Sequence, residues 1–463
     1  MKLLPADRSG PRLASFTQEE RLTHGRDIHL MNNVLVFGCQ VEGDLEPCRL
    51  RDALIGLRRR HEALRWVFPK TGTGTHPVDL RAVDEVDFQE FSTETDDTDE
   101  AMDTAKQLIA DAAAVPFDLS QGPLIRVLCI RTAPARHLVG FVIDHVIADG
   151  ASCQILADDL FTLYASGSAP AHAELPPLPF QFSDFAFSER QFLRGDELDR
   201  LMKYWRRKLA GVGTVPASLL TDPDGPPGGQ PRLRVGRFTL ERPLYAEFAR
   251  AARQHRVTPS AVFAAALKIT MRHWRRRLGA SEDIASDVAI MGSLANRNHQ
   301  ELERAVGYFA TPCVLRTDLS GAPTLAEAAQ RESRTIFGAL RHQELPHALM
   351  TREIDAAHYG IRHRSALGQG PRYVNFDVSG AGAAWRLDTA QLRIRITRIP
   401  RNEVPRGGIR MLVRDAGDTA LVELRTDTRE YSEGWAERFL QDYVDVLRQF
   451  AADPGVSLEQ VPH

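Results

Sequence analysis

Residues 141–152 read FVIDHVIADGAS and place a histidine between two aspartates at the end of an apolar run. An imidazole exchanges a proton near neutral pH, so His145 can act as a general base or hold a reacting group by hydrogen bonding. Asp149 can orient the loop by pairing with a cation, and Gly150 permits tight backbone geometry. The alternative is an ordinary turn, in which Asp149 caps a helix that begins near ASCQILADDL.

The elements before this motif predict an α/β lobe that presents it. The apolar run HLVGFVI indicates a strand that ends where the motif begins, and strand ends hold reactive side chains in fixed positions. Asp44, near an N-cap, and Pro47, in a first turn, mark the start of a helix. The other expected elements are the strands HLMNNVLVFGCQVEG and LIRVLCIRT and the helices DLEPCRLRDALIGLRRRHEALRWVF and TDEAMDTAKQLIADAAAVPF. We therefore expect an N-terminal lobe over residues 1–175 that carries DHVIADG.

The segment SGSAPAHAELPPLPFQFSDF is rich in proline and small residues and is the expected crossing into a second lobe over residues 176–463. A helix in TPSAVFAAALKITMRHWRRRLG has Thr258 as N-cap, Pro259 as first residue and Gly279 at its C-terminal stop. A last helix spans about 432–450. The expected strands of this lobe are VGRFTLE, DIASDVAIMGS, FATPCVLRTDL, RYVNFDVSG, LRIRITRI and ALVELRTDT.

Composition excludes several classes of protein. The 463 residues are 43% hydrophobic and 26% charged with a net charge of -3, so no basic nucleic-acid-binding footprint is expected. No apolar run approaches the roughly 20 residues that cross a membrane, and the amino terminus lacks the apolar region of a secretory signal, so the sequence predicts a cytoplasmic protein. The five cysteines form no CxxC pair, which indicates neither a disulfide framework nor a metal site. Cys153 can be a nucleophile, but we favour a small buried apolar side chain.

Several further segments, in their order along the chain, resemble the condensation domains of nonribosomal peptide synthetases. DHVIADG is similar to the HHxxxDG core motif of that family. The other similar segments are RHEALRWVF, FSDFAF, YWRRKLAG, SLANRN, VGYFATPCVLRTDL and RHQELPHALM. The resemblance implies an α/β fold of two chloramphenicol-acetyltransferase-like lobes that form a V with a central tunnel. It also implies that the C-terminal lobe contains the crossing segment and a floor region.

The resemblance implies a role for each site residue. The family joins an acyl group, held as a thioester on the phosphopantetheine arm of a carrier protein, to an amine or an alcohol, and the domain itself binds no cofactor. His145 corresponds to the catalytic histidine, and Gly150 to a glycine whose backbone lies near the thioester. Asp149 corresponds to a structural aspartate, with Arg297 of ANRN as its salt-bridge partner. Asn375 aligns with a strand region that lines the tunnel, although plain strand packing is the interpretation we favour there.

The first histidine of the family motif is Asp144 in this chain. Successive side chains of a strand face opposite ways, so Asp144 and His145 are not expected to share the tunnel face. An aspartate can replace a packing and hydrogen-bonding histidine if a donor is available. A buried anion beside His145 favours the protonated ring, unless Asp144 is itself paired or protonated. We favour structural replacement over loss of catalysis.

These features predict a stand-alone condensation enzyme of specialised-metabolite biosynthesis that forms an amide or an ester. With no adenylation or carrier sequence beside it, such an enzyme meets an acyl or peptidyl carrier protein in trans, together with a small-molecule amine or alcohol acceptor. An acyl-CoA-dependent acyltransferase is less favoured because the DFGWG motif of that branch is absent. A non-catalytic domain that recruits a carrier-bound intermediate or a partner enzyme is the other alternative.

Overall fold

The computed structural model of the protein describes residues 1–7, 12–24, 34–70, 77–93, 95, 97–166, 175–212, 222, 228–230, 232–353, 374–380, 385–389, 391–400 and 408–461. The chain divides into two compact units. Unit 1 comprises Met1–Glu197, Ala295–Ala310 and Ala384–Glu403, and unit 2 comprises Leu198–Leu294, Thr311–Ala383 and Val404–His463. Within the described ranges, no helix combines the length and the apolar character that a bilayer crossing requires. The lobe boundary at residue 175 stays a prediction.

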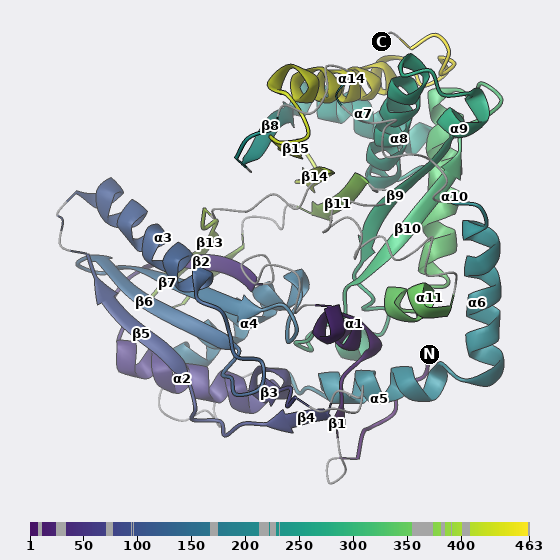
Figure 1. The fold of residues 1–463 in the computed structure, drawn as a ribbon. Helices are drawn as coiled ribbons and strands as arrows, with labels where there is room; N and C mark the ends of the chain where they lie inside the picture. The colour runs from purple at the N-terminus through teal and green to yellow at the C-terminus, as the bar shows by residue number, and fades with distance from the viewer. Residues whose placement is uncertain are drawn as a thin grey trace. The chain divides into compact units, whose positions relative to one another are not determined.

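Unit 1 is built on a six-stranded sheet in the order β12-β13-β2-β7-β6-β5 (Figure 1). Among these described strands, β5 and β6 pair in parallel, and the other neighbours are antiparallel. The strands are β2 (Val34–Glu42), β5 (Asp87–Ser92), β6 (Ile125–Ala133), β7 (Arg136–Asp144), β12 (Arg386–Asp388) and β13 (Arg393–Thr397). A separate small sheet contains β1 (Arg12–Leu13), β4 (Pro77–Leu80) and β3 (Trp66–Val67).

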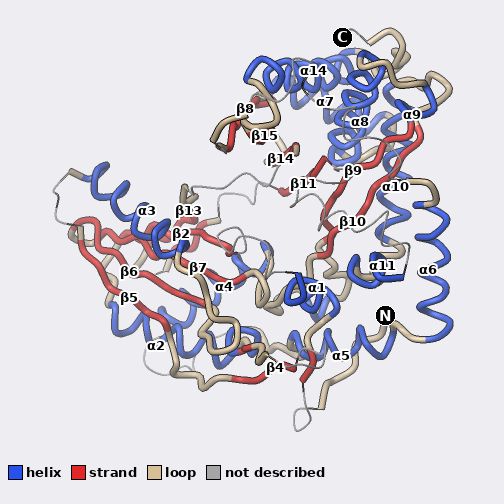
Figure 2. The backbone as a smooth tube through the Cα atoms, viewed as in Figure 1, coloured by secondary structure: helices blue, strands red, loops and turns tan. Residues whose placement is uncertain are grey.

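Helices cover both faces of the large sheet of unit 1. Figure 2 shows α3 (Thr98–Ala114) and α2 (Pro47–Arg60) on opposite sides of the strands. Alternate residues of β7 enter two separate cores, with Leu138 and Val142 on the α3 side and Val139 and Phe141 on the other. This is the expected result of a side-chain period of two in a strand buried on both faces.

The remaining helices of unit 1 are α1 (Phe16–His24), α4 (Gly150–Ala165) and α5 (Phe182–Phe192). The second core is the one that contains Val139 and Phe141, and in it α2 and α4 pack against the strands. Helix α4 follows β7 after one turn. The helix predicted after Asp44 is present, but Asp44 is not its N-cap. Glu46 occupies that position without a side-chain cap, and Pro47 begins the helix. Since proline has no N–H to satisfy, it fits the first helical position without a capping side chain.

Unit 1 also contains two pieces from late in the sequence. Strand β13 pairs with β2, and the register places Arg393 opposite Glu42. The indole Nε1 of Trp385 donates to Asp158 Oδ1 on α4 over 2.8 Å. The piece Ala295–Ala310 contains the short 3-10 helix Gln300–Leu302, and its Leu302 and Phe309 are buried in the second core.

Unit 2 has its own six-stranded sheet, in the order β10-β9-β11-β14-β15-β8. Strand β11 runs parallel to β9 and β14, and the other pairs are antiparallel. Both large sheets are therefore mixed, in keeping with the predicted α/β class. The strands are β8 (Leu233–Leu240), β9 (Asp287–Leu294), β10 (Thr311–Asp318), β11 (Val374–Gly380), β14 (Ile409–Asp415) and β15 (Ala420–Asp427).

The helices of unit 2 are α6 (Gly195–Leu209), α7 (Arg242–Gln254), α8 (Pro259–Arg277), α9 (Glu282–Ser286), α10 (Leu325–Leu340), α11 (His347–Glu353) and α14 (Glu433–Ala452), of which α6 begins in unit 1. The predicted cap of α8 is confirmed, because Thr258 accepts from the Ala261 N–H and Pro259 begins the helix. The strand predicted for DIASDVAIMGS is wrong in its first half, where residues form α9. Glu282 and Asp283 in the first turn favour that helix electrostatically.

Candidate functional site

The sequence motif lies where β7 ends. Asp144 is the last residue of the strand, opposite Val34 of β2, and its N–H donates to the Leu124 carbonyl over 2.9 Å. His145 is the first residue of the following turn, which leads directly into α4 at Gly150. The strand and the helix therefore hold His145 between two fixed backbone ends, and the residue as a whole is half-buried.

Asp144 is buried and paired. Arg21 Nη2 of α1 donates to Asp144 Oδ1 over 2.6 Å, and the two side chains are only 12% and 8% exposed. The same carboxylate oxygen accepts from the Val146 N–H over 2.8 Å. Gln18, also on α1, donates its Nε2 to the Val146 carbonyl over 2.7 Å. Two side chains of α1 thus hold the backbone and the carboxylate on both sides of His145.

The ring of His145 packs against the ring of Tyr308, with centroids 4.6 Å apart and planes at 56°. Within the described residues its Nδ1 is buried without a hydrogen-bond partner, so Nε2 is the nitrogen that a reacting group can meet. Burial and the Arg21 guanidinium lower the pKa of His145, against opposition from its own backbone, Asp149 and Asp144. The ring is therefore neutral at physiological pH and can accept a proton.

Asp149 is the N-cap of α4 and is 1% exposed. Its Oδ1 accepts from the Ser152 N–H and from Arg297 Nη2, each over 2.9 Å. Its Oδ2 accepts from the Phe309 N–H over 3.3 Å. Arg297 also donates from Nη1 to the Leu302 and Ala305 carbonyls, and its guanidinium lies 4.2 Å from the centroid of the Phe309 ring. The structure thus brings Asp149 and Arg297 together, and their structural role stays a prediction.

Gly150 is exposed and begins α4. A Cβ built on it meets no atom within 4 Å, and its φ is not in the left-handed region. Nothing in the described residues therefore requires a glycine for folding at this position. Open space therefore lies beside the motif at the start of α4.

Other predicted positions lie elsewhere. Asn375 is on β11 of unit 2 with an exposed side chain, and its role in substrate binding stays a prediction. Cys153 is half-buried on α4, and its Sγ lies 3.6 Å from the Asp149 carbonyl. Among the described residues, no group of three or more His, Cys, Asp or Glu side chains is arranged to hold a metal ion.

Two surface hollows are lined by residues outside the motif. A hollow of about 500 Å³ in unit 2 is lined by Tyr204, Arg207, Lys208, Asp283, Asp287, Arg316, Asp318 and Ser320. Another of about 710 Å³ in unit 1 is lined by Val67, Pro69, Lys70, Asp79, Leu80, Arg81, Ser120 and Gln121. Neither includes His145, so the chemistry of the motif rather than the size of a hollow identifies the candidate site.

Sequence reasoning missed three residues that contact the motif: Gln18, Arg21 and Tyr308. Gln18 and Arg21 lie three positions apart on α1, a spacing that places them on one helical face. Their partners are far along the chain, since Arg21 and Asp144 are separated by 123 positions. The sequence itself carries no local signal for these pairings.

A family model described as Condensation domain matches residues 29–462. A linear gramicidin synthase protein from Brevibacillus parabrevis is 31% identical over 359 residues, which cover 76% of this chain and 7% of that synthase protein. Phosphinothricin tripeptide synthetase PhsC from Streptomyces viridochromogenes is 28% identical over 467 residues, which cover 98% of this chain and 40% of the synthetase. The chain thus spans less than half the length of these peptide synthetases.

Solved structures share the fold over nearly the whole chain. The X-domain from teicoplanin biosynthesis matches with a TM-score of 0.80 at 22% identity and covers 100% of both chains. That X-domain is also known in a complex with OxyB. The first condensation domain of the calcium-dependent antibiotic synthetase, in complex with a substrate analogue, matches with a TM-score of 0.75 at 16% identity, over 98% of this chain and 99% of that one. With the family model matching residues 29–462, the chain belongs to the condensation domain family.

Proposed function

We propose that this protein transfers an acyl or aminoacyl group from the phosphopantetheine thioester of a carrier protein to an amine or an alcohol. His145 is the catalytic residue, and Gly150 leaves room for the thioester at the start of α4. Asp144, Asp149 and Arg297 support the site without touching the reacting atoms. Membership of the condensation domain family supports this class of reaction.

One observation carries the proposal: His145 directly follows β7 and lies between two aspartates that are each paired with an arginine. Burial and Arg21 lower its pKa, so the base form is present at neutral pH. A general base works best when its pKa lies near the working pH, where the unprotonated form is present and still binds a proton well. The neighbouring carboxylates are each held in an ion pair with an arginine.

In the proposed reaction, the acceptor nitrogen or oxygen attacks the thioester carbonyl carbon and forms a tetrahedral intermediate. His145 accepts the proton that the acceptor loses. The C–S bond then breaks, the new amide or ester remains, and His145 returns the proton to the departing thiolate. An amine with a solution pKa of about 8 is already partly nucleophilic, so positioning contributes more for an amine and base catalysis more for an alcohol.

The test uses a separately purified carrier protein loaded with candidate acyl groups and mixed with amine or alcohol acceptors. Intact-protein mass spectrometry follows loss of the acyl group from the carrier and formation of product. His145→Ala should abolish product formation and leave the melting temperature nearly unchanged, because His145 lies in a turn and is not a residue of the buried core. His255→Ala is the matched control, since His255 is a partly exposed histidine at the end of α7 in unit 2. Full turnover by His145→Ala would refute the catalytic assignment.

A second candidate is a domain that recruits a carrier-bound intermediate or a partner enzyme without catalysis. The complex of the structurally similar X-domain with OxyB favours it, because that protein with this fold binds another protein. Carrier or partner binding without turnover, with every loaded carrier and with acyl-CoA donors, would support recruitment. Turnover with acyl-CoA but not with a loaded carrier would instead indicate an acyl-CoA-dependent acyltransferase.

A further inference from the structure

Helix α1 holds the loop of His145 at two points. Arg21 pairs with the Asp144 carboxylate, and Gln18 donates to the Val146 carbonyl, so the residues before and after His145 are both fixed. Gln18 is itself buried and oriented, because its Oε1 accepts from the Ser15 N–H over 2.9 Å. An exposed ion pair would contribute little, but this one is largely shielded from water and so acts strongly on a neighbouring charge.

The charged groups that act on His145 come from three parts of unit 1. Asp144 precedes it, Asp149 caps α4, and Arg21 belongs to α1; the ring of Tyr308 lies against the imidazole. Arg297 already neutralises Asp149. Asp144 is adjacent to His145 in the sequence, so its charge would hold a proton on the ring if Arg21 did not pair with it.

We propose that Arg21 is a positioning residue for His145: its ion pair with Asp144 cancels the carboxylate beside the ring, fixes the loop and keeps the imidazole available as a base. The proposal rests on the proposed function for its catalytic meaning, but the charge relation can be measured without turnover. It also explains how an aspartate is tolerated at this position of the motif. Helix α1 supplies the guanidinium of Arg21 as the ion-pair partner of this aspartate.

Direct titration of His145 tests the proposal. The protein is labelled at its histidines, and NMR follows the ring signals against pH; the signal that disappears in His145→Gln is assigned to His145. Arg21→Gln leaves the Asp144 charge unpaired and should raise the pKa of His145 by about one unit. Asp144→Asn removes the carboxylate beside the ring while the Arg21 charge stays in place, so it should lower the pKa of His145. The double variant Arg21→Gln with Asp144→Asn carries neither charge and should return close to the wild type.

Enzyme kinetics give a second readout. A base must be unprotonated, so the acid limb of kcat/KM against pH follows the pKa of His145. The acid limb should move to higher pH in Arg21→Gln and to lower pH in Asp144→Asn, while Arg21→Lys, which keeps the charge, stays near the wild type. A purely structural role predicts lower activity in both single variants without opposite shifts of the limb.

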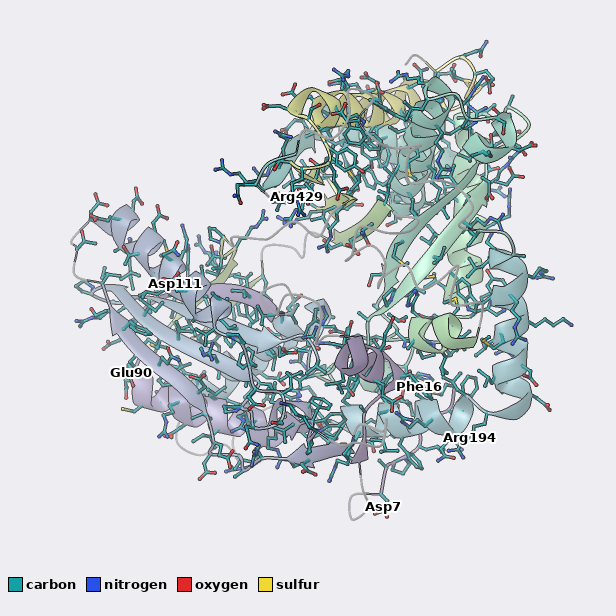
Figure 3. The ribbon with its side chains drawn as sticks, in the orientation of Figure 1. Asp7, Phe16, Glu90, Asp111, Arg194 and Arg429 are labelled. Atoms are coloured by element: carbon teal, nitrogen blue, oxygen red, sulfur yellow. The ribbon has the colours of Figure 1, made fainter. Side chains whose placement is uncertain are left out.

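Glu19→Gln is the matched control. Glu19 lies on the same helix and pairs with Arg190 over 2.6 Å, with both side chains about one-fifth exposed. Arg190 also lies 4.6 Å from the ring centroid of Phe16, the residue labelled at the start of α1 in Figure 3. This variant removes an ion pair of α1 without touching the loop, so the titration of His145 should not change.

Two results would overturn the proposal: an unchanged titration of His145 in Arg21→Gln, or shifts of the same sign in both single variants. If Arg21→Gln does not fold, Asp144→Asn alone tests the charge relation, because it should lower the pKa of His145 and an unchanged titration would contradict the proposal. A wild-type protein without turnover would refute the proposed function, yet opposite shifts in the NMR titration would still uphold the charge relation. The two failures are therefore distinguishable.

Discussion

At the scale of single residues, the two aspartates that flank His145 are neutralised by arginines from different segments. Asp144 pairs with Arg21 of α1, and Asp149 pairs with Arg297 of the piece Ala295–Ala310. Removing one partner of a buried pair leaves an uncompensated charge, which is costly. The histidine thus lies between two aspartates whose charges are each compensated by an arginine.

We expect substitution of Gly150 to lower activity without a large change in stability. Gly150→Ala should change the free energy of unfolding by no more than about 0.5 kcal/mol, because the added Cβ is exposed and meets nothing within 4 Å. If the thioester lies against this backbone, the same methyl group should lower kcat/KM. Urea denaturation and steady-state kinetics measure the two effects. An unchanged kcat/KM would mean that the thioester does not approach Gly150.

At the scale of elements, α4 joins separate parts of unit 1 through three aspartates. Asp149 holds Arg297, and Asp158 accepts from Trp385. Asp159 is fully buried and accepts from His61 Nε2 over 2.8 Å, from Arg60 Nε over 2.7 Å and from Arg304. Burial alone would raise the pKa of Asp159, but these donors outweigh it and lower the value to about 2. The helix that follows the candidate catalytic residue therefore also organises the unit.

Arg297→Ala should destabilise the protein by about 3–5 kcal/mol, because it leaves the Asp149 carboxylate buried without its cation. Adding Asp149→Asn should recover much of this loss, since the buried charge is then removed as well. Urea denaturation of the two variants measures both changes. Arg242→Ala is the control: its ion pair with Asp418 is exposed at both ends, so little change is expected. A loss as small as that of the control would contradict a structural role for the Asp149–Arg297 pair.

The strand and the helix that flank His145 were predicted from the sequence, but most of the side-chain contacts around it were not. The apolar run before Asp144 and the Asp-Gly pair after it are local signals, and β7 and α4 follow them. The pairing of Arg21 with Asp144 joins positions far apart, and no local pattern of charges identifies such a partner. Arg297 was named only through the resemblance to the family.

Element assignment failed where two local signals competed. The residues directly before β9 were predicted as part of that strand. They form the short helix α9 instead, whose first turn contains Glu282 and Asp283. Strand β14 (Ile409–Asp415) was not predicted, although it pairs with β11 and β15. Alternate residues of β14, Ile409, Met411 and Val413, are buried, and the positions between them are less buried.

At the scale of the whole molecule, unit 1 cannot be taken as one continuous stretch of sequence. A fragment of residues 1–197 lacks both Ala295–Ala310 and Ala384–Glu403, so β2 loses its partner β13 and Asp149 loses Arg297. We expect this fragment to aggregate or to lack a cooperative thermal transition in circular dichroism. The full chain, measured in parallel, should unfold cooperatively. A soluble, cooperatively folded fragment would show that the two late pieces are dispensable for the fold.

The pairing of β13 with β2 also bears on synthesis of the protein. Glu42 and Arg393 face each other in the sheet although about 350 residues separate them, which takes roughly 20 to 70 s to translate. During that interval β2 presents an unpaired strand edge, which is a template for association with other chains. We therefore expect ribosome-bound chains to carry this unpaired edge until β13 has been made, and lack of chaperones during translation to lower the yield of folded protein.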